Sequence, residues 1–234
     1  MIRRSILLSI ILLSFGLSVY GQKEKVKNLP YVDMRMFHLG FHLGFHSQDM
    51  LITNNGQRIG GETWFAEIPS YSPGFSVGVI GEMFLNSYMS LRFSPTINFG
   101  DKKFIFKEST TEEEFTTNVR SNYLSFPLDL KITSLRLNNY RPYFIAGVYG
   151  SYDLGRKKGN PLLLKSKDYG IAFGIGCDLY LPYFKLCPEL KFCFGLTNLL
   201  ETNRSDLSDT SIQKYAQSLS KLTSRMVVFT FNFE

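Results

Sequence analysis

The sequence predicts an all-β protein, an eight-stranded antiparallel transmembrane β-barrel of the outer-membrane type. Three observations predict it. Eight segments alternate apolar residues with polar or small ones, which is the period of a β-strand with two different faces. Long and short connections alternate between these segments, and the N-terminus has the form of a secretory signal peptide.

The signal peptide is expected to cover residues 1–21. Arg3 and Arg4 precede an apolar run of about 14 residues from Ile6 to Val19. This run is shorter than the roughly 20 residues that a membrane-spanning helix needs, so an uncleaved anchor is disfavoured. No cysteine lies near the cleavage site, which also disfavours a lipid anchor.

Removal of the signal peptide lowers the formal charge from +6 to +4, because it takes away two arginines and no acid. So small a charge does not indicate a nucleic-acid partner. No later segment is apolar for long enough to form a spanning helix. We assign residues 22–35 to a periplasmic segment and 36–234 to one barrel domain, in which strands must do the spanning.

The first segment, 36–46, shows the alternation in an unusual form. Its odd positions are Phe or Leu, and its even positions from 38 onward are His or Gly. Residues two apart share a face of a strand. A barrel in lipid turns its apolar face outward around a polar interior. The side chains expected to meet lipid are Phe37, Leu39, Phe41, Leu43 and Phe45.

Seven further segments continue the two-residue period, most clearly between Leu124 and Thr133 and between Ile171 and Leu181. Each is long enough to cross a bilayer at a tilt. The last one alternates aromatic residues up to Phe233 and resembles the C-terminal signal of barrels that the assembly machinery inserts. The eight segments are 36–46, 74–84, 87–99, 119–133, 141–153, 169–181, 184–196 and 224–233.

The connections predict which end of the barrel faces which side. Long ones are expected at 47–73, at about 100–118, at 154–168 and at 197–223, and short ones lie between them. Outer-membrane barrels have long extracellular loops and short periplasmic turns. Within the last loop, residues 211–222 have apolar positions at helical spacing, so a short amphipathic helix and an irregular polar loop both remain open.

The barrel must be closed because its outer surface faces lipid hydrocarbon. An unpaired backbone group facing hydrocarbon costs several kcal/mol, so the first and last strands must pair and leave no free edge.

The faces expected to point inward carry charges of both signs. An unpaired buried charge is costly, so these charges should pair across strands. An eight-stranded barrel has an interior just wide enough for side chains. We therefore expect a filled lumen that conducts no folded protein. The inward charged residues are Asp129, Lys131, Asp178, Glu189 and Lys191, with Arg92 and Arg120 as further candidates.

No metal or redox site is expected. His38, His42 and His46 are the only histidines, and on a strand their neighbours stand about 13 Å apart, too far to share a zinc ion. We expect them to point into the lumen. Cys187 and Cys193 lie about 20 Å apart along one strand and cannot form a disulfide bond within it.

The third cysteine, Cys177, falls on the apolar face of its strand. We interpret all three cysteines as small packing residues.

The sequence also gives no catalytic set. Some small outer-membrane barrels modify lipids, and Ser47, His46 and Asp49 contain the residue types of a triad. They are nearly consecutive at a strand end, where the directed geometry of a triad is hard to build. No phosphate loop, CxxC pair or HExxH motif is present. We expect no enzymatic activity and no cofactor.

Two blocks resemble the PorT family of outer-membrane proteins, also called SprT in gliding bacteria. The first reads Asn-Tyr-Leu-Ser-Phe-Pro-Leu-Asp-Leu-Lys over 122–131 and continues with Asn-Tyr-Arg-Pro-Tyr over 139–143, Gly147 and Tyr-Asp-Leu over 152–154. The second reads Asp-Leu-Tyr-Leu-Pro-Tyr-Phe-Lys over 178–185, followed by Pro-Glu-Leu-Lys over 188–191 and Gly-Leu-Thr-Asn over 195–198. The similarity extends from about Met36 to Leu200.

The resemblance implies a non-enzymatic component of type IX secretion, needed for export of cargo across the outer membrane and, in some relatives, for gliding. Its partners would be outer-membrane lipid and other secretion components, with no nucleic acid and no small-molecule substrate. Two alternatives remain open. One is a generic structural or adhesive barrel, and the other is an enzyme that modifies lipid A.

Overall fold

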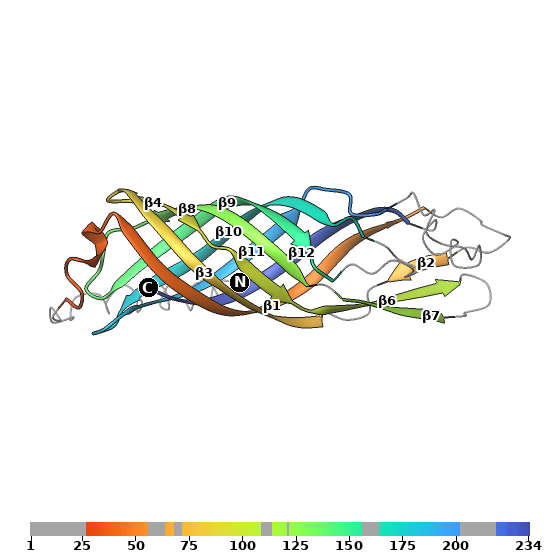
Figure 1. Cartoon of the computed structure of the whole chain (residues 1–234), viewed down its shortest axis with the longest axis horizontal. Coiled ribbons are helices and arrows are strands. Elements are labelled where there is room, and N and C mark those ends of the chain that lie inside the picture. The colour runs from red at the N-terminus through yellow and green to blue at the C-terminus, as the bar shows by residue number, and fades with distance from the viewer. Residues whose placement is uncertain are drawn as a thin grey trace, which may run out of the picture.

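Nine antiparallel strands form a closed ring in the computed structural model, which describes residues 27–55, 64–67, 72–108, 114–120, 122–155, 164–201 and 219–234 (Figure 1). The first strand pairs with the last and also with the second strand of the ring, so the sheet closes on itself. In order around the ring the strands are β1 (Phe37–Asn54), β3 (Ser72–Asn86), β4 (Met89–Phe93) with β5 (Thr96–Phe99), β8 (Tyr123–Thr133), β9 (Tyr140–Asp153), β10 (Lys167–Tyr180), β11 (Lys185–Gly195) and β12 (Leu219–Phe233).

Strands β4 and β5 are two parts of one barrel strand. Both pair with β3 and β8 in a single continuous register. The break falls at Ser94-Pro95, where the proline has no N–H to give to the ladder. Eight positions around the ring are therefore filled, and the predicted fold class, a closed antiparallel barrel of the outer-membrane type, is confirmed.

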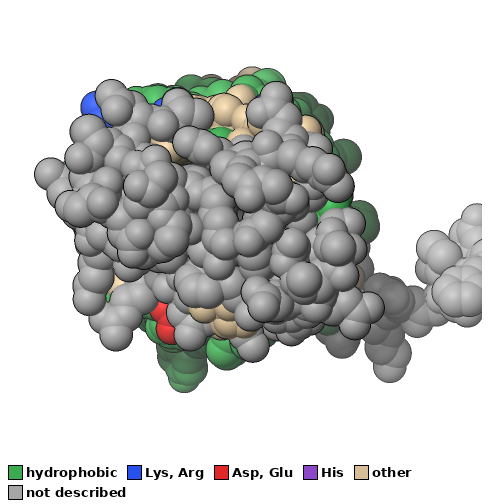
Figure 2. Space-filling view, turned by 90° about the vertical axis from the view of Figure 1, so that its right-hand side faces the viewer, with side chains coloured by type: hydrophobic (Ala, Val, Ile, Leu, Met, Phe, Trp, Pro, Cys, Tyr) green, Lys and Arg blue, Asp and Glu red, His purple; other side chains and the backbone are tan. Residues whose placement is uncertain are grey.

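The outer surface of the ring is apolar, as the alternation predicts. The five residues of β1 expected to face lipid, Phe37 to Phe45 at the odd positions, are between 38% and 82% exposed. The view from the long-loop end shows hydrophobic side chains along the upper, right and lower edges of the molecule (Figure 2). Among the described residues, no helix is long and apolar enough to cross a membrane.

Two expected loops contain strands, which corrects the sequence prediction. β1 runs on from His46 to Asn54, into the connection expected at 47–73. A separate three-stranded sheet lies beyond the long-loop end of the barrel and consists of β2 (Trp64–Glu67), β6 (Asp101–Glu108) and β7 (Glu114–Arg120) (Figure 1). The connection expected at 100–118 is thus mostly the β6–β7 hairpin, and the predicted strand 119–133 belongs to two strands, β7 and β8.

The last strand also begins earlier than predicted. Leu219 and Leu222, which fitted a helical spacing, lie in β12 and are buried. The rest of the expected helix lies outside the described residues, as does the signal peptide at 1–21.

Large rings inside the barrel face glycines on the neighbouring strand. His42 lies directly opposite Gly78 and His46 opposite Gly74. On the other side of the barrel, Tyr143 in β9 lies opposite Gly176 in β10. A Cβ atom on any of these glycines would collide with the ring that faces it. The glycines of the alternating pattern therefore make room for rings in a narrow lumen.

Candidate functional site

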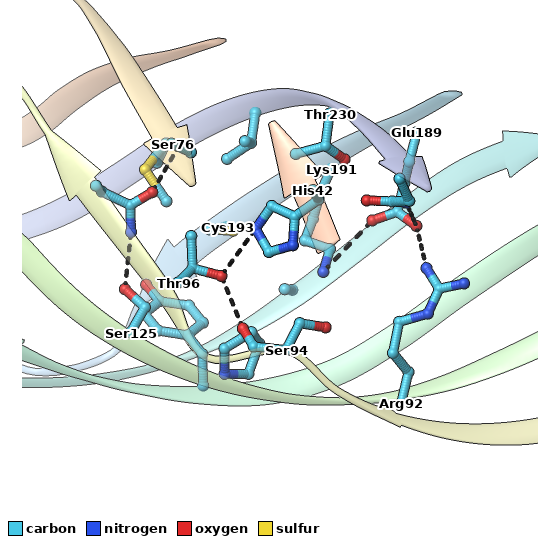
Figure 3. A pocket seen from close by; sticks show the side chains of 17 residues that line it. His42, Ser76, Arg92, Ser94, Thr96, Ser125, Glu189, Lys191, Cys193 and Thr230 are labelled. Carbon is cyan, nitrogen blue, oxygen red and sulfur yellow. Dashed lines mark hydrogen bonds and ion pairs between the residues drawn. The ribbon is translucent and has the colours of Figure 1, made fainter. Parts of the chain in front are cut away.

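Arg92 lies at the centre of the barrel and binds three carboxylates. Its side chain is 2% exposed, and its guanidinium nitrogens lie 2.7 Å from Glu82 Oε2, 2.8 Å from Glu189 Oε2 and 2.8 Å from Glu234 Oε1. Figure 3 shows Arg92 reaching Glu189 across the lumen. An arginine is suited to this position because its planar fork donates in several directions at once.

Lys131 forms the next connection in the network. Its ammonium nitrogen lies 2.9 Å from Asp178 Oδ1 and 3.5 Å from Glu82 Oε2. The same nitrogen lies 4.4 Å from the centre of the Tyr143 ring. The Tyr143 hydroxyl donates a hydrogen bond of 2.9 Å to Glu189. These contacts join the inward faces of β3, β8, β9, β10 and β11.

Two further lysines complete the cluster. Lys191 lies 2.6 Å from Asp129 Oδ2 and 3.5 Å from Glu189 Oε1. The ammonium of Lys185 contacts the carboxylate of Glu234. We call the nine charged side chains of this network the ion-pair layer: Glu82, Arg92, Asp129, Lys131, Asp178, Lys185, Glu189, Lys191 and Glu234.

The structure confirms that the predicted charges point inward and pair across strands, with the exception of Arg120, whose side chain lies outside the described part. Three further members of the layer, Glu82, Lys185 and Glu234, are not among the inward charges predicted from the sequence. The two-residue period does place them on the inner face, because each lies two residues from another inward position, as Glu234 does from Asn232. A layer of mutually paired buried charges fills the lumen, which fits a barrel that passes no large cargo.

His46 belongs to a directed chain of hydrogen bonds along the wall above the layer. The Ser76 hydroxyl donates to Asn98 Oδ1 at 2.7 Å, and Asn98 Nδ2 donates to Ser125. Ser76 must therefore accept from His46 Nδ1, 2.7 Å away, which leaves His46 Nε2 to accept from Gln48. His46 thus donates toward Ser76 and cannot act as its base.

Thr96, which His42 holds in place, supplies a hydrogen-bond donor that is missing from the wall next to Pro95. Pro127 in β8 has no N–H for the carbonyl of Ser94 opposite it. The Thr96 hydroxyl donates to this carbonyl at 2.7 Å instead, and it accepts from His42 Nε2 at 3.1 Å. The inward position of the histidines is as predicted, and among the described residues no group of His, Cys, Asp and Glu could hold a metal ion.

The three residues considered for a triad are not brought together. His46 bonds Ser76 inside the barrel, whereas Asp49 faces outward and contacts Arg225 at 3.3 Å. Ser47 lies on the outward face with Asp49. All three cysteines are free, and Cys187 and Cys193 are buried in the lumen wall, Cys193 packing with Ala172 and Val228.

Three small cavities along the lumen are bordered by described residues. The first, about 60 Å³, lies directly above the ion-pair layer and is bordered by His42, Thr96, Arg92 and Lys191 (Figure 3). A second cavity of about 40 Å³ follows toward the long-loop end and shares Asn98 with the first. A third of about 20 Å³ lies below the layer. Their sizes suit several waters rather than a larger ligand.

The chain before β1 covers the end of the barrel that has the short turns. We call residues 27–36 the strap; it contains the 3₁₀ helix η2 (Val32–Met34). Asp33 accepts a hydrogen bond of 2.7 Å from the Tyr180 hydroxyl and lies 3.5 Å from Arg141. Arg136 stacks 3.6 Å from the centre of the Tyr180 ring and donates to the backbone of the strap. In outer-membrane barrels this end faces the periplasm.

The chain was compared with known proteins. Among solved structures, the chain is similar to outer membrane protein AlkL in lipid bilayers, with 14% identity, 92% of each chain covered and a TM-score of 0.43. It is also similar to Ail, the attachment invasion locus protein of Yersinia pestis, with 10% identity, 83% of this chain and 96% of that chain covered and TM-scores of 0.34 and 0.33 in two structures. No curated protein is significantly similar in sequence.

A family model, described as outer membrane protein beta-barrel domain, matches residues 20–201. This match covers well over half of the chain, and the closed ring of strands with an apolar outer face is the structure that it implies. The protein therefore belongs to the outer membrane protein beta-barrel domain family and resides in the outer membrane.

Proposed function

We propose that the barrel is a non-enzymatic component that assists export of proteins across the outer membrane by type IX secretion, and gliding motility where the bacterium glides. The observation that carries this proposal is the filled lumen. A barrel closed by buried ion pairs offers no passage to cargo, so its contribution to export comes from contacts with other envelope proteins.

The residues that carry the sequence resemblance to the PorT family support the proposal. The first block supplies Asp129 and Lys131, and the second supplies Asp178, Lys185 and Glu189, all of which belong to the ion-pair layer. The resemblance therefore lies in the residues that fill the lumen, and not only in the general alternation that small barrels share.

The periplasmic end offers a surface for such contacts. Tyr31, Met34 and Met36 of the strap are 75%, 77% and 67% exposed, and Leu135 and Leu137 in the next turn are each 67% exposed. Apolar side chains gathered on one exposed end are typical of protein interaction sites. We infer that this end receives a periplasmic or outer-membrane component of the secretion machinery.

Deletion of the gene is expected to abolish release of type IX cargo into the culture supernatant, and the wild-type gene should restore it. Complementation with the double variant Met34→Ser/Leu137→Ser should restore the barrel, seen as heat-modifiable migration, but not secretion. Phe65→Ser, at the opposite end of the molecule, is the matched control and should restore both. Unchanged secretion in the deletion strain would rule the proposal out.

A second candidate function is adhesion, which the small sheet of β2, β6 and β7 beyond the barrel favours. Replacement of the β6–β7 hairpin, Asp101 to Arg120, by a short turn separates the two candidates. If the protein is an adhesin, the variant should lose surface binding while secretion stays intact. If it is the proposed secretion component, the variant should be present in the same amount as the wild type and should support the same secretion.

A further inference from the structure

Cavities lie on both sides of the ion-pair layer. The cavity of about 60 Å³ above it is bordered by Arg92 and Glu189. The cavity of about 20 Å³ below it is bordered by Glu82 and Lys131 and reaches Asp33 of the strap. One layer of side chains therefore separates the two cavities.

Two buried polar atoms border the cavities above the layer. Within the described part of the chain, Thr230 Oγ1 and Gln48 Oε1 are buried without a hydrogen-bond partner, and they border the first and second cavities respectively. Buried polar atoms of this kind are satisfied by water where a cavity has room for it. With a cavity on each side, the ion-pair layer separates the two ends of the lumen.

The three carboxylates that bind Arg92 do not depend on it alone for a countercharge. Glu82 has Lys131 at 3.5 Å, and Glu189 has Lys191 at 3.5 Å. Glu234, its third partner, also contacts the ammonium of Lys185. Each carboxylate that binds Arg92 thus keeps a second cation.

This redundancy lowers the usual cost of breaking a buried ion pair. That cost arises because one charge is left buried and uncompensated. When Arg92 moves out of the layer, each of its three carboxylates keeps contact with a lysine, and five carboxylates then share three lysines.

We propose that the lumen is a latent pathway for small hydrated cations, closed by the Arg92 side chain and opened when that side chain leaves the ion-pair layer. The preference for cations follows from the charges. The side chains of the layer comprise five carboxylates and four cations, a formal charge of −1, which becomes −2 when Arg92 is displaced. This activity is separate from the role in secretion.

The test is ion conduction by the purified full-length barrel in planar bilayers under a KCl gradient. Arg92→Ala should raise the open fraction at least about tenfold over the wild type, a factor that corresponds to about 1.4 kcal/mol. Its reversal potential should shift toward the equilibrium potential of K⁺. Arg92→Lys, which keeps a cation in the layer, should remain close to the wild type.

Arg225→Ala is the matched control, because it removes an arginine from the outer face of β12 whose side chain is 48% exposed. It should conduct no more than the wild type. The proposal is overturned if folded Arg92→Ala is as silent as the wild type, if Arg225→Ala conducts equally, or if the current is carried by anions. It is also overturned if neither Arg92→Ala nor Arg92→Gln shows heat-modifiable migration, since the barrel must keep its fold when Arg92 leaves.

Discussion

Val79→Arg is expected to lower the free energy of unfolding of the barrel by about 2–4 kcal/mol, the cost of an arginine on the lipid face near the bilayer midplane. Val79 lies on the outer face of β3, is 60% exposed and pairs with Phe41, the middle residue of the lipid-facing run of β1. It makes few contacts that the substitution would remove. The loss therefore reports the transfer of charge into hydrocarbon rather than a loss of packing.

Denaturant titration in lipid vesicles, followed by heat-modifiable gel migration, measures this difference. The matched control is Leu51→Arg. This variant also places an arginine on the outer face of the barrel, in β1, at a position that is 53% exposed. Leu51 lies beyond Asp49 and Arg225, which form an outward-facing ion pair and mark the edge of the apolar band. A loss below about 1 kcal/mol is expected there. Equal losses at the two positions would contradict a membrane boundary between them.

The same ion pair explains why the sequence predicted the barrel but not its full height. Inside the lipid band, one face of each strand must be apolar, so the alternation from Phe37 to Phe45 is readable without any structure. Beyond Asp49 the outer face meets water, and the contrast between the two faces disappears. β1 therefore runs on to Asn54 without a signal. β6 and β7 lie wholly beyond the band, and their lysines and glutamates gave the composition of a loop.

The charged interior was predictable in its direction but not in its pairing. A period of two places Asp129 and Lys131 on the inner face. It does not say that Lys131 selects Asp178, or that Asp129 binds Lys191, because those partners depend on strand register and tilt. The role of Thr96 in replacing a proline donor has the same origin, since it requires knowing which carbonyl lies opposite Pro127.

A glycine on the inner face of the barrel packs against a buried ring, and this contact predicts the effect of a substitution. Gly176 lies opposite Tyr143. A Cβ atom there would lie 2.7 Å from Tyr143 Cε2 and nearer still to the ring's Cζ and hydroxyl. The ring cannot easily give way, because Tyr143 is buried and its hydroxyl is held by Glu189. At Gly81, which lies with Val79 on the outer face of β3, the nearest atom to a Cβ is the carbonyl oxygen of Phe93 at 3.9 Å, which is ordinary contact.

Gly176→Ala should therefore lower the free energy of unfolding by about 1–3 kcal/mol, the usual cost of overpacking a filled interior. The identical substitution at Gly81 should be neutral or stabilise by up to about 1 kcal/mol, because alanine restricts the unfolded chain. The same vesicle titration compares the two variants. If both behave alike, the change reflects strand propensity and not the fit of ring against glycine. If only Gly176→Ala lowers the free energy of unfolding, the close fit of the Tyr143 ring against Gly176 contributes to the stability of the barrel.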